Sequence, residues 1–501
     1  MFITLVIREI LDAILSYRFM LVALLCLVLV PLSLFVSLKN YEYRMESFRE
    51  LDKTSQAQAA KKDVYHNHSF KGYRRPSLLS IFSHGLGDKL PHKVTVRNSG
   101  VTIETRRDQG NLYSALWGRI DFVFIVTNFL SILAIIFSYS TICGEKDTLR
   151  LVAANDVSRS NIILGKITGN FLVFLVPFFM ALLIGLVMLT FSPGFSLTNR
   201  DTVVPLLLVV ILTVGFLFVI FCLGVLVSLF TRQPNSSLVL LLFLWILMSL
   251  VIPKTSPMIA HILIPLRSEQ SMEREVKAVL KNINQEQIGE ESKLYKQCQA
   301  EAGDKEPEPE KENQTRIMIS SSSFGQESQA VKNMYDQRVG PIRGKYETMK
   351  EKAEAGLRDA YNKRKHLQLG LSRLISQLSP VSGYVYAVTE LCGTGFSEIE
   401  NFQDHSEAYY RNVKHAVYDL WETKTYYMGA GHYTSSTGPK KGVDFKALRD
   451  KKRPELYFSQ YRMIPLSVRV RKILFDVLLT FIYGVLFFSV AYVKFIRYDM
   501  T

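Results

Sequence analysis

The sequence predicts an α-helical polytopic membrane protein with six transmembrane helices and two extracytoplasmic insertions. Of its 501 residues, 48% are hydrophobic and 21% are charged, and charged residues are rare in six long apolar windows. Each window has about 20 residues or more, the length that a helix needs to cross a hydrocarbon core about 30 Å thick. Such windows do not fit the short alternating strands of a barrel, so helices must satisfy the backbone in lipid.

The chain is divided between these spans and the segments that join them. Residues 1–18 predict a cytoplasmic interfacial helix, because isoleucines recur on one face: Ile3, Ile7, Ile10 and Ile14. No small-residue cleavage site follows the first window, so we expect a retained anchor. Near the third span, Gly165 and Gly169 form a small-xxx-small surface for close helix packing. The predicted spans are residues 19–38, 119–141, 167–192, 203–231, 233–253 and 473–494, and residues 495–501 form a tail.

Basic residues in the short connections predict the orientation, because they are retained on the cytoplasmic side. They lie before the first span, between the second and third spans, and after the sixth. Both termini and residues 142–166 are therefore predicted to be cytoplasmic. The basic run from Arg469 to Lys472 falls on the opposite side, and we discount it because it follows a long translocated domain.

The first insertion, residues 39–118, predicts a small α+β domain. The helix of the first span is expected to continue outward into a charged, helix-forming stretch. Further on, valine and isoleucine alternate with other residues on both sides of Asn98-Ser99-Gly100. This is the pattern of a β-hairpin.

The second insertion, residues 254–472, is predicted to be mostly helical with a long helical hairpin. Its first helix is expected from about Ser268 onward. The second is expected after Pro341, where apolar residues recur every three or four positions: Ile342, Tyr346, Met349, Ala353, Leu357 and Tyr361. Residues 301–329, between the helices, are rich in Pro, Glu, Ser and Gln, so we expect a mobile tip.

Few residues predict chemistry in these insertions. His66 and His68 are weak metal candidates, which a membrane-bound metalloenzyme would need, and surface histidines are the simpler interpretation. Cys298 and Cys392 would form a disulfide if the compartment is oxidising. No catalytic residue, resident metal or cofactor is predicted, because the sequence has no phosphate-binding loop, zinc-protease motif or nucleophile elbow.

The formal net charge of +15 does not indicate nucleic-acid binding. The basic residues are dispersed, and no recognised nucleic-acid-binding motif accompanies them. Attraction to anionic lipid headgroups explains the excess at least as well. Membrane lipids are therefore an expected partner, and nucleic acid is not.

Residues 143–166, CGEKDTLRLVAANDVSRSNIILGK, carry seven charges between two apolar spans. They resemble the cytoplasmic loop of ABC-2 type transporter permeases at Glu145, Thr148-Leu149, Val157-Ser158-Arg159 and Ile163-Leu164-Gly165-Lys166. Asp147 and Asp156 depart from the family pattern, in which glycine and proline are usual. The stretches PSLLSIFSHGLGDKLP and LSRLISQLSPVSGYVY resemble the subgroup with large extracytoplasmic insertions.

The resemblance implies the permease subunit of an ATP-driven exporter for a lipophilic or amphipathic substrate, in a prokaryotic plasma (inner) membrane. It also implies two copies of a separate ATPase subunit, which carry ATP and Mg²⁺, and a second permease that is either another copy or a sister chain. Residues 142–166 would couple the ATPase to the spans. The implied coupling residues are Glu145, Thr148, Leu149, Arg150, Leu151, Val152, Asp156, Ser158 and Arg159.

Two other interpretations stay open. The polar segment can be a solvated connector that merely follows the positive-inside rule. The protein can also be a mechanical signalling or scaffold protein, in which ATP hydrolysis moves the long hairpin against an extracytoplasmic partner without transport. The sequence does not predict the substrate.

Overall fold

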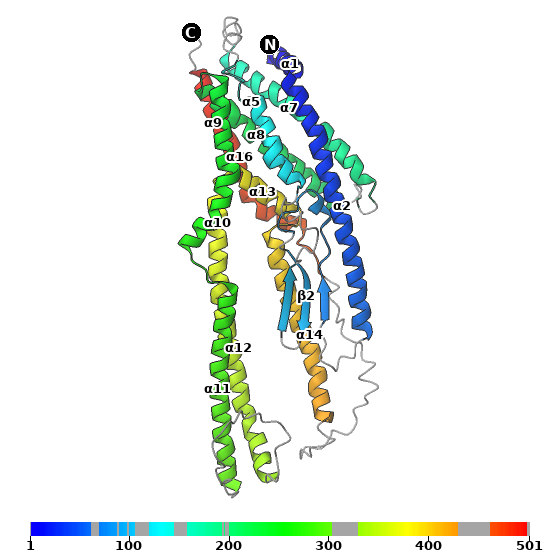
Figure 1. Cartoon of the computed structure of the whole chain (residues 1–501), viewed down its shortest axis with the longest axis vertical. Coiled ribbons are helices and arrows are strands. Elements are labelled where there is room, and N and C mark those ends of the chain that lie inside the picture. Colours follow the sequence, from blue (N-terminus) through cyan, green and yellow to red (C-terminus); the bar gives the residue numbers. More distant parts are fainter. Residues whose placement is uncertain are drawn as a thin grey trace. The chain divides into compact units, whose positions relative to one another are not determined.

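The computed structural model describes residues 2–61, 70–87, 90–97, 100–105, 120–144, 158–192, 195, 200–302, 329–428 and 461–497. The chain divides into two units, which are described separately: Met1–Pro253 with Ser376–Thr501, and Lys254–Ile375. Figure 1 shows the elements of both units. The first unit contains most of the apolar helices and a sheet, and the second contains a pair of long helices.

Five apolar helices are long enough to cross a membrane. They cover Tyr17–Ala57, Arg159–Thr190, Arg200–Phe230, Pro234–Leu263 and Leu466–Ile496. The corresponding elements are α2 (Tyr17–Lys61), α7 (Arg159–Thr190), α8 (Arg200–Phe230), α9 (Pro234–Ile246) with η3 (Leu247–Val251) and α10 (Ile252–Leu263), and α16 (Leu466–Ile496). The outward extension predicted for the first span is confirmed, since α2 continues to Lys61. The fifth helix contains the π-helical turn η3 and continues to Leu263, past the predicted limit at residue 253.

A sixth apolar helix is shorter. α4 (Phe122–Phe124), the π-helical turn η2 (Ile125–Leu130) and α5 (Ser131–Ser138) follow one another directly and together have fewer residues than the other five. At its end, the guanidinium of Arg18 donates to Ser140 Oγ and lies 4.9 Å from the ring centre of Tyr139. This helix therefore returns to the level at which α2 begins. The number of six spans stays a prediction.

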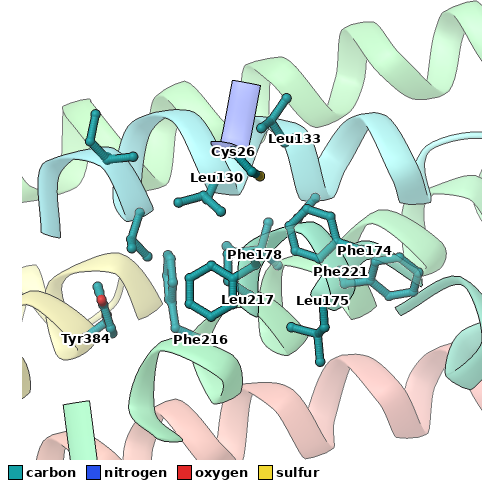
Figure 2. Packing of buried hydrophobic residues seen from close by; sticks show 14 of the residues in the cluster. Cys26, Leu130, Leu133, Phe174, Leu175, Phe178, Phe216, Leu217, Phe221 and Tyr384 are labelled. Atoms are coloured by element: carbon teal, nitrogen blue, oxygen red, sulfur yellow. The ribbon is translucent and has the colours of Figure 1, made fainter. Parts of the chain in front are cut away.

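The core of the first unit is apolar and rich in phenylalanine (Figure 2). Phe171 of α7 packs against Phe221 of α8 with their ring centroids 5.5 Å apart. Phe174, Phe178 and Phe216 have no exposed surface. Offset and edge contacts of this kind are the favourable arrangements of aromatic rings, so they fix the packing of α7 on α8.

A short helix from the predicted second insertion lies among the apolar helices. α13 (Pro380–Leu391) is buried along most of its length and packs against α8 and α16. The ring of Tyr384 stacks on Phe216 at 4.6 Å, and its hydroxyl lies 2.9 Å from Thr213 Oγ1 (Figure 2). The sequence places these residues in the second insertion and does not predict their burial among the apolar helices. Its cause is the apolar composition of α13, which is stabilised by burial although the helix is too short to be recognised as a span.

The predicted α+β character of the first insertion is confirmed by an antiparallel sheet of order β1-β2-β3. The strands are β1 (Phe70–Tyr73), β2 (Pro91–Arg97) and β3 (Gly100–Thr105). In the predicted hairpin Val94 pairs with Ile103 and Val96 with Val101, and the turn residues 98–99 lie outside the described residues. Val94 and Val96 pack on Phe402 and Tyr409 of α14 (Phe396–Met428).

The second unit confirms the predicted helical hairpin. Its helices are α11 (Glu269–Ala302) and α12 (Gln329–Ser376). They are antiparallel, because Glu301 contacts Arg338 whereas the earlier residue Gln287 contacts the later residue Lys350. The seam between them buries Met272, Val276, Ile283, Val331, Val339 and Tyr346.

Two details of the predicted hairpin differ from the structure. The second helix begins before Pro341, which lies inside α12, because the sequence from Gln329 also favours a helix and one proline removes only one backbone donor. Met349, expected on the packed face, is 44% exposed. The predicted mobile tip falls on residues 303–328, which lie outside the described residues.

Candidate functional site

The charged segment between α5 and α7 is described only at its two ends. Residues 145–157 lie outside the described residues. They include seven of the nine predicted coupling residues: Glu145, Thr148, Leu149, Arg150, Leu151, Val152 and Asp156. Ser158 and Arg159 are described, and so are the residues that precede Glu145. The structure therefore shows how this segment, residues 145–157, is attached to the helices on either side.

The first attachment is made to the end of α8. The backbone N–H groups of Ile142 and Cys143 both donate to Ser228 Oγ, each at 3.2 Å. All three residues are buried, so the hydroxyl satisfies two donors that have left the helical pattern of α5. The chain thus enters the segment from a point held against α8.

The second attachment begins with the cap of α7. Ser158 Oγ accepts a hydrogen bond from the backbone N–H of Asn161 at 3.4 Å, as expected of an N-cap serine. Because of this cap, α7 begins at Arg159, well before the predicted span limit at residue 167. Ser158 therefore has a structural role at the helix start. Arg159 Nη1 donates to the carbonyl oxygen of Ile496, near the end of α16, at 2.8 Å.

A third attachment joins α7 to α1 (Phe2–Ile14). Lys166 Nζ lies 2.9 Å from Glu9 Oε1, and the two side chains are 5% and 15% exposed. Gly165 and Gly169 lie on the same side of α7, against Leu5, Val6 and Glu9. The small-xxx-small surface predicted near the third span therefore packs on α1. Sequence motifs indicated the glycines, but nothing in the sequence pairs Lys166 with a residue so far away in the chain.

These attachments connect the residues on either side of the segment to several helices. The residues before it contact α8, the first residue of α7 contacts the end of α16, and Lys166 further along α7 contacts α1. The described contacts thus connect the residues on either side of segment 145–157 to α8, α16 and α1.

The described residues provide no metal site. No group of three or more His, Cys, Asp or Glu side chains among them could hold a metal ion. The weak candidates His66 and His68 lie outside the described residues. His84 lies in the first unit and donates its backbone N–H to Asp121 Oδ2 at 2.7 Å, which ties the first insertion to the start of α4.

The predicted disulfide stays a prediction. Cys298 lies on α11 in the second unit, and Cys392 follows α13 in the first unit. Both are buried free thiols in the structure.

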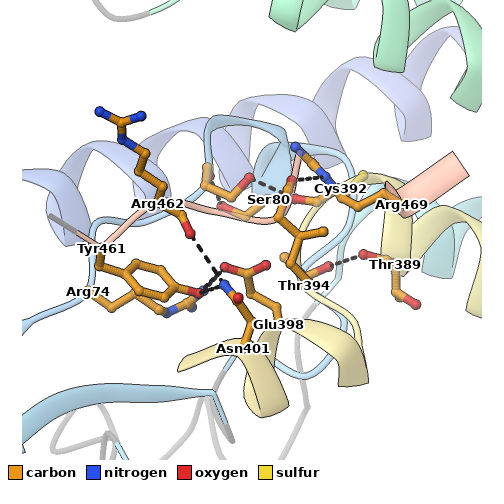
Figure 3. Close-up of polar contacts among 12 residues, drawn as sticks. Arg74, Ser80, Thr389, Cys392, Thr394, Glu398, Asn401, Tyr461, Arg462 and Arg469 are labelled. Carbon is orange, nitrogen blue, oxygen red and sulfur yellow. Dashed lines mark hydrogen bonds and ion pairs between the residues drawn. The ribbon is translucent and has the colours of Figure 1, made fainter. Parts of the chain in front are cut away.

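A second polar cluster lies at the opposite end of α16 (Figure 3). We call it the outer junction and define it by Arg74, Ser77, Cys392, Glu398, Tyr461 and Arg469. Arg469 donates from Nε to Ile464 O and from Nη1 to Leu391 O, both at 2.8 Å. Ser77 Oγ donates to Cys392 O at 2.7 Å. Gly393, which follows Cys392, has a φ of +67°, a conformation that glycine adopts without strain.

The other half of the outer junction is a buried ion pair with a tyrosine. Arg74 Nη1 lies 4.0 Å from Glu398 Oε1, and the hydroxyl of Tyr461 donates to the same carboxylate. Burial raises the pKa of Tyr461, and the negative charge of Glu398 raises it further, so the hydroxyl keeps its proton. Asn401 Nδ2 donates to Tyr461 Oη at 3.1 Å. The junction joins the first insertion, the start of α14 and the segment before α16.

Comparison with known proteins identifies the family. A family model described as ABC-2 family transporter protein matches residues 3–500, nearly the whole chain. No curated protein matches the sequence. The match agrees with the apolar helices of a multi-pass membrane protein. The chain is therefore a member of the ABC-2 transporter family, whose members are membrane subunits of the permease type.

Proposed function

We propose that the protein is the permease subunit of an ATP-driven ABC exporter. A separate ATPase subunit, present in two copies, binds residues 145–157 on the cytoplasmic side of a prokaryotic inner membrane. ATP and Mg²⁺ bind to that subunit. The observation that carries the proposal is the attachment of the segment to α8, α16 and α1.

The attachments support coupling because they hold the residues on both sides of the segment. The hydrogen bonds of Ser228 hold the first end, and the capped helix α7 forms the second end. Closure of an ATPase dimer displaces whatever is bound in its cleft, and a segment fixed at both ends transfers this displacement to the spans. A solvated connector would not require anchors on three helices.

A second permease would complete the transport pathway, because one such bundle forms half of it. The second permease would be another copy of this chain or a sister chain. α9 carries apolar side chains that are exposed in the single chain, which supports their contact with a second permease or with lipid: Val239, Leu240, Phe243 and Ile246. We take the exporter's substrate to be lipophilic or amphipathic, as the resemblance to the family implies.

The test is co-expression with the ATPase encoded beside this gene, followed by purification and an ATPase assay. We expect the wild-type chain to retain the ATPase. Arg159→Glu combined with Leu151→Asp should weaken retention or coupled hydrolysis about tenfold, equivalent to about 1.4 kcal/mol. Arg497→Glu, an exposed charge change at the same end of the unit, is the control and should leave both unchanged. Equal behaviour of the two variants would contradict the proposal.

A second candidate function is mechanical action on an extracytoplasmic partner without transport. The outer junction favours it, because Arg469 and Tyr461 tie the outer end of α16 to α13 and α14, so movement of α16 would reach the external elements. Mass spectrometry of the purified complex separates the candidates. A lipid or peptide retained in wild-type complex and released upon ATP hydrolysis supports export, whereas an external protein captured in its place supports mechanical action.

A further inference from the structure

The N-terminal helix is held to the start of α7 by more than its chain connection. α1 precedes α2 and lies along α7 (Figure 1). Glu9 of α1 and Lys166 of α7 form an ion pair of 2.9 Å although they are 157 positions apart. Lys166 lies within the first turns of α7, the helix that follows segment 145–157, on which the proposed function places the force of the ATPase.

The two helices also approach closely. A side chain added at Gly169 would place its Cβ 2.8 Å from Glu9 Cβ and 3.3 Å from Val6 O. Ile10 and Ala13 of α1 pack on the core of the unit. Glycine at position 169 thus allows backbones to touch, and such contacts resist sliding better than contacts between long side chains.

Burial distinguishes this ion pair from the hydrogen bond between the start of α7 and the end of α16. Glu9 and Lys166 are 15% and 5% exposed, so separating them would leave a charge in a poorly hydrated place. The bond between Arg159 and Ile496 O is exposed, and water replaces such a bond at little cost. We therefore expect the contact with α16 to open under load before the contact with α1.

The face of α1 that does not pack on α7 is exposed and apolar, so it can stay in contact with lipid while the helix moves. Ile3, Ile7 and Leu11 are 70%, 50% and 56% exposed, and they lie on a helix that leads directly into the first span. Apolar side chains on an interfacial helix stay in contact with lipid while the helix shifts parallel to the membrane. The surface of α1 therefore does not anchor it against movement with α7.

We propose that α1 and the first turns of α7 form one rigid body, joined by the Glu9–Lys166 ion pair, which the ATPase moves relative to α16. Glu9 is then a positioning residue, because its ion pair makes the N-terminal helix move together with α7 when the ATPase acts. The inference rests on the proposed function, and it adds a second moving helix to the coupling path.

Distances between spin labels in the full complex with its ATPase test this inference. The five native cysteines are buried, so labels can be directed to Asp12→Cys on α1, Ser160→Cys on α7 and Val493→Cys on α16. Each complex should contain one labelled permease, obtained by dilution with unlabelled chain. Distances are measured without nucleotide and with ATP and vanadate.

We expect the 160–493 and 12–493 distances to shift together by a few ångströms, while the 12–160 distance stays constant. In Glu9→Gln, the 160–493 shift should persist and the 12–160 distance should become broad or nucleotide-dependent. Exchange of the charges in Glu9→Lys with Lys166→Glu should restore the constant distance. Arg8→Gln is the control, because the partner of Arg8, Asp12, is already replaced in the labelled chain, and it should keep the 12–160 distance constant.

The possible outcomes separate this inference from the proposed function. If the 160–493 distance does not respond to nucleotide, the ATPase does not move α7 and the proposed function fails. If it responds and the 12–160 distance changes by as much in the wild-type chain, α1 stays behind and only the inference is overturned. Should Glu9→Gln fail to fold, the wild-type distances and the charge exchange still decide.

Discussion

Arg469 shows how one residue can violate a topology rule for a structural reason. It belongs to the basic run that the predicted topology places outside, where positive charge is disfavoured. Its guanidinium donates to Leu391 O and Ile464 O, two carbonyl groups near helix ends that have no helical partner of their own. The charge is thus used to join the end of α13 to the start of α16, rather than to orient the chain.

Replacement of this residue gives a prediction at the same scale. Arg469→Leu should lower the free energy of unfolding by about 1.5–3 kcal/mol, because it removes charged donors and leaves carbonyl groups unpaired. The loss is measured by thermal unfolding in detergent, with hydrogen exchange near Leu391 as a local readout. The matched control is Arg471→Leu, because Arg471 is exposed. If both replacements cost the same, the contacts of Arg469 contribute nothing specific.

Local motifs predicted some site residues but not their long-range partners. The glycines at 165 and 169 were recognisable as a packing surface, and Ser158 has the residue type and position of a helix cap. Lys166 and Glu9 could not be paired, because neither composition nor periodicity relates residues on two separate helices. Ser228 was missed for the same reason: a serine within a span usually bonds to its own helix, and here it accepts from Ile142 and Cys143.

At the scale of elements, periodic patterns predicted the structures whose paired elements are neighbours in the sequence. The β2-β3 hairpin and the α11–α12 hairpin were predicted because each partner follows its neighbour in the chain. The position of α13 was not predicted. Its 12 residues are too few for a span, and its burial between α8 and α16 depends on helices that are distant in the sequence.

The helical hairpin contains an ion pair that predicts a pH dependence. Glu291 accepts from Arg343 Nε at 3.2 Å and from Nη2 at 3.1 Å. The hydrogen bonds from Arg343 are the main cause that lowers the pKa of Glu291 below its ordinary value of 4.5. A carboxyl whose pKa is lowered on folding stabilises the hairpin above the unfolded pKa, and the contribution is lost as the pH falls through the folded pKa.

We therefore expect the pairing of α11 with α12 to weaken below about pH 4.5, by about 1 kcal/mol for an exposed bidentate pair. Hydrogen exchange of both helices in the full chain, compared at pH 7 and at lower pH, measures this loss. Glu291→Gln should weaken the hairpin at pH 7 and remove most of its pH dependence. Glu273→Gln is the control, because Glu273 is an exposed carboxylate on the same helix α11. A pH response that survives in Glu291→Gln would assign it to other groups.

At the scale of the whole chain, the contacts at the start of α7 bear on the number of spans. Glu9 near the N-terminus and Ile496 near the C-terminus both contact the first turns of α7. The two ends of the chain therefore lie at one end of the first unit (Figure 1). A polypeptide that starts and finishes on the same side of a membrane crosses it an even number of times. Among the described residues five helices qualify as spans by length and composition, so we predict from parity that the shorter helix from Phe122 to Ser138 also crosses.

Labelling of single exposed cysteines in intact cells tests this parity. We expect a membrane-impermeant maleimide to label Lys53→Cys and Arg200→Cys, and to label Asp12→Cys and Arg497→Cys only after lysis. The positive-inside rule gives these sides, and the contacts of α7 require that positions 12 and 497 behave alike. If position 497 were labelled in intact cells while position 12 was protected, the crossings would be odd in number. The helix Phe122–Ser138 would then lie within one leaflet, and residues 145–157 could not face an ATPase on the side of the N-terminus.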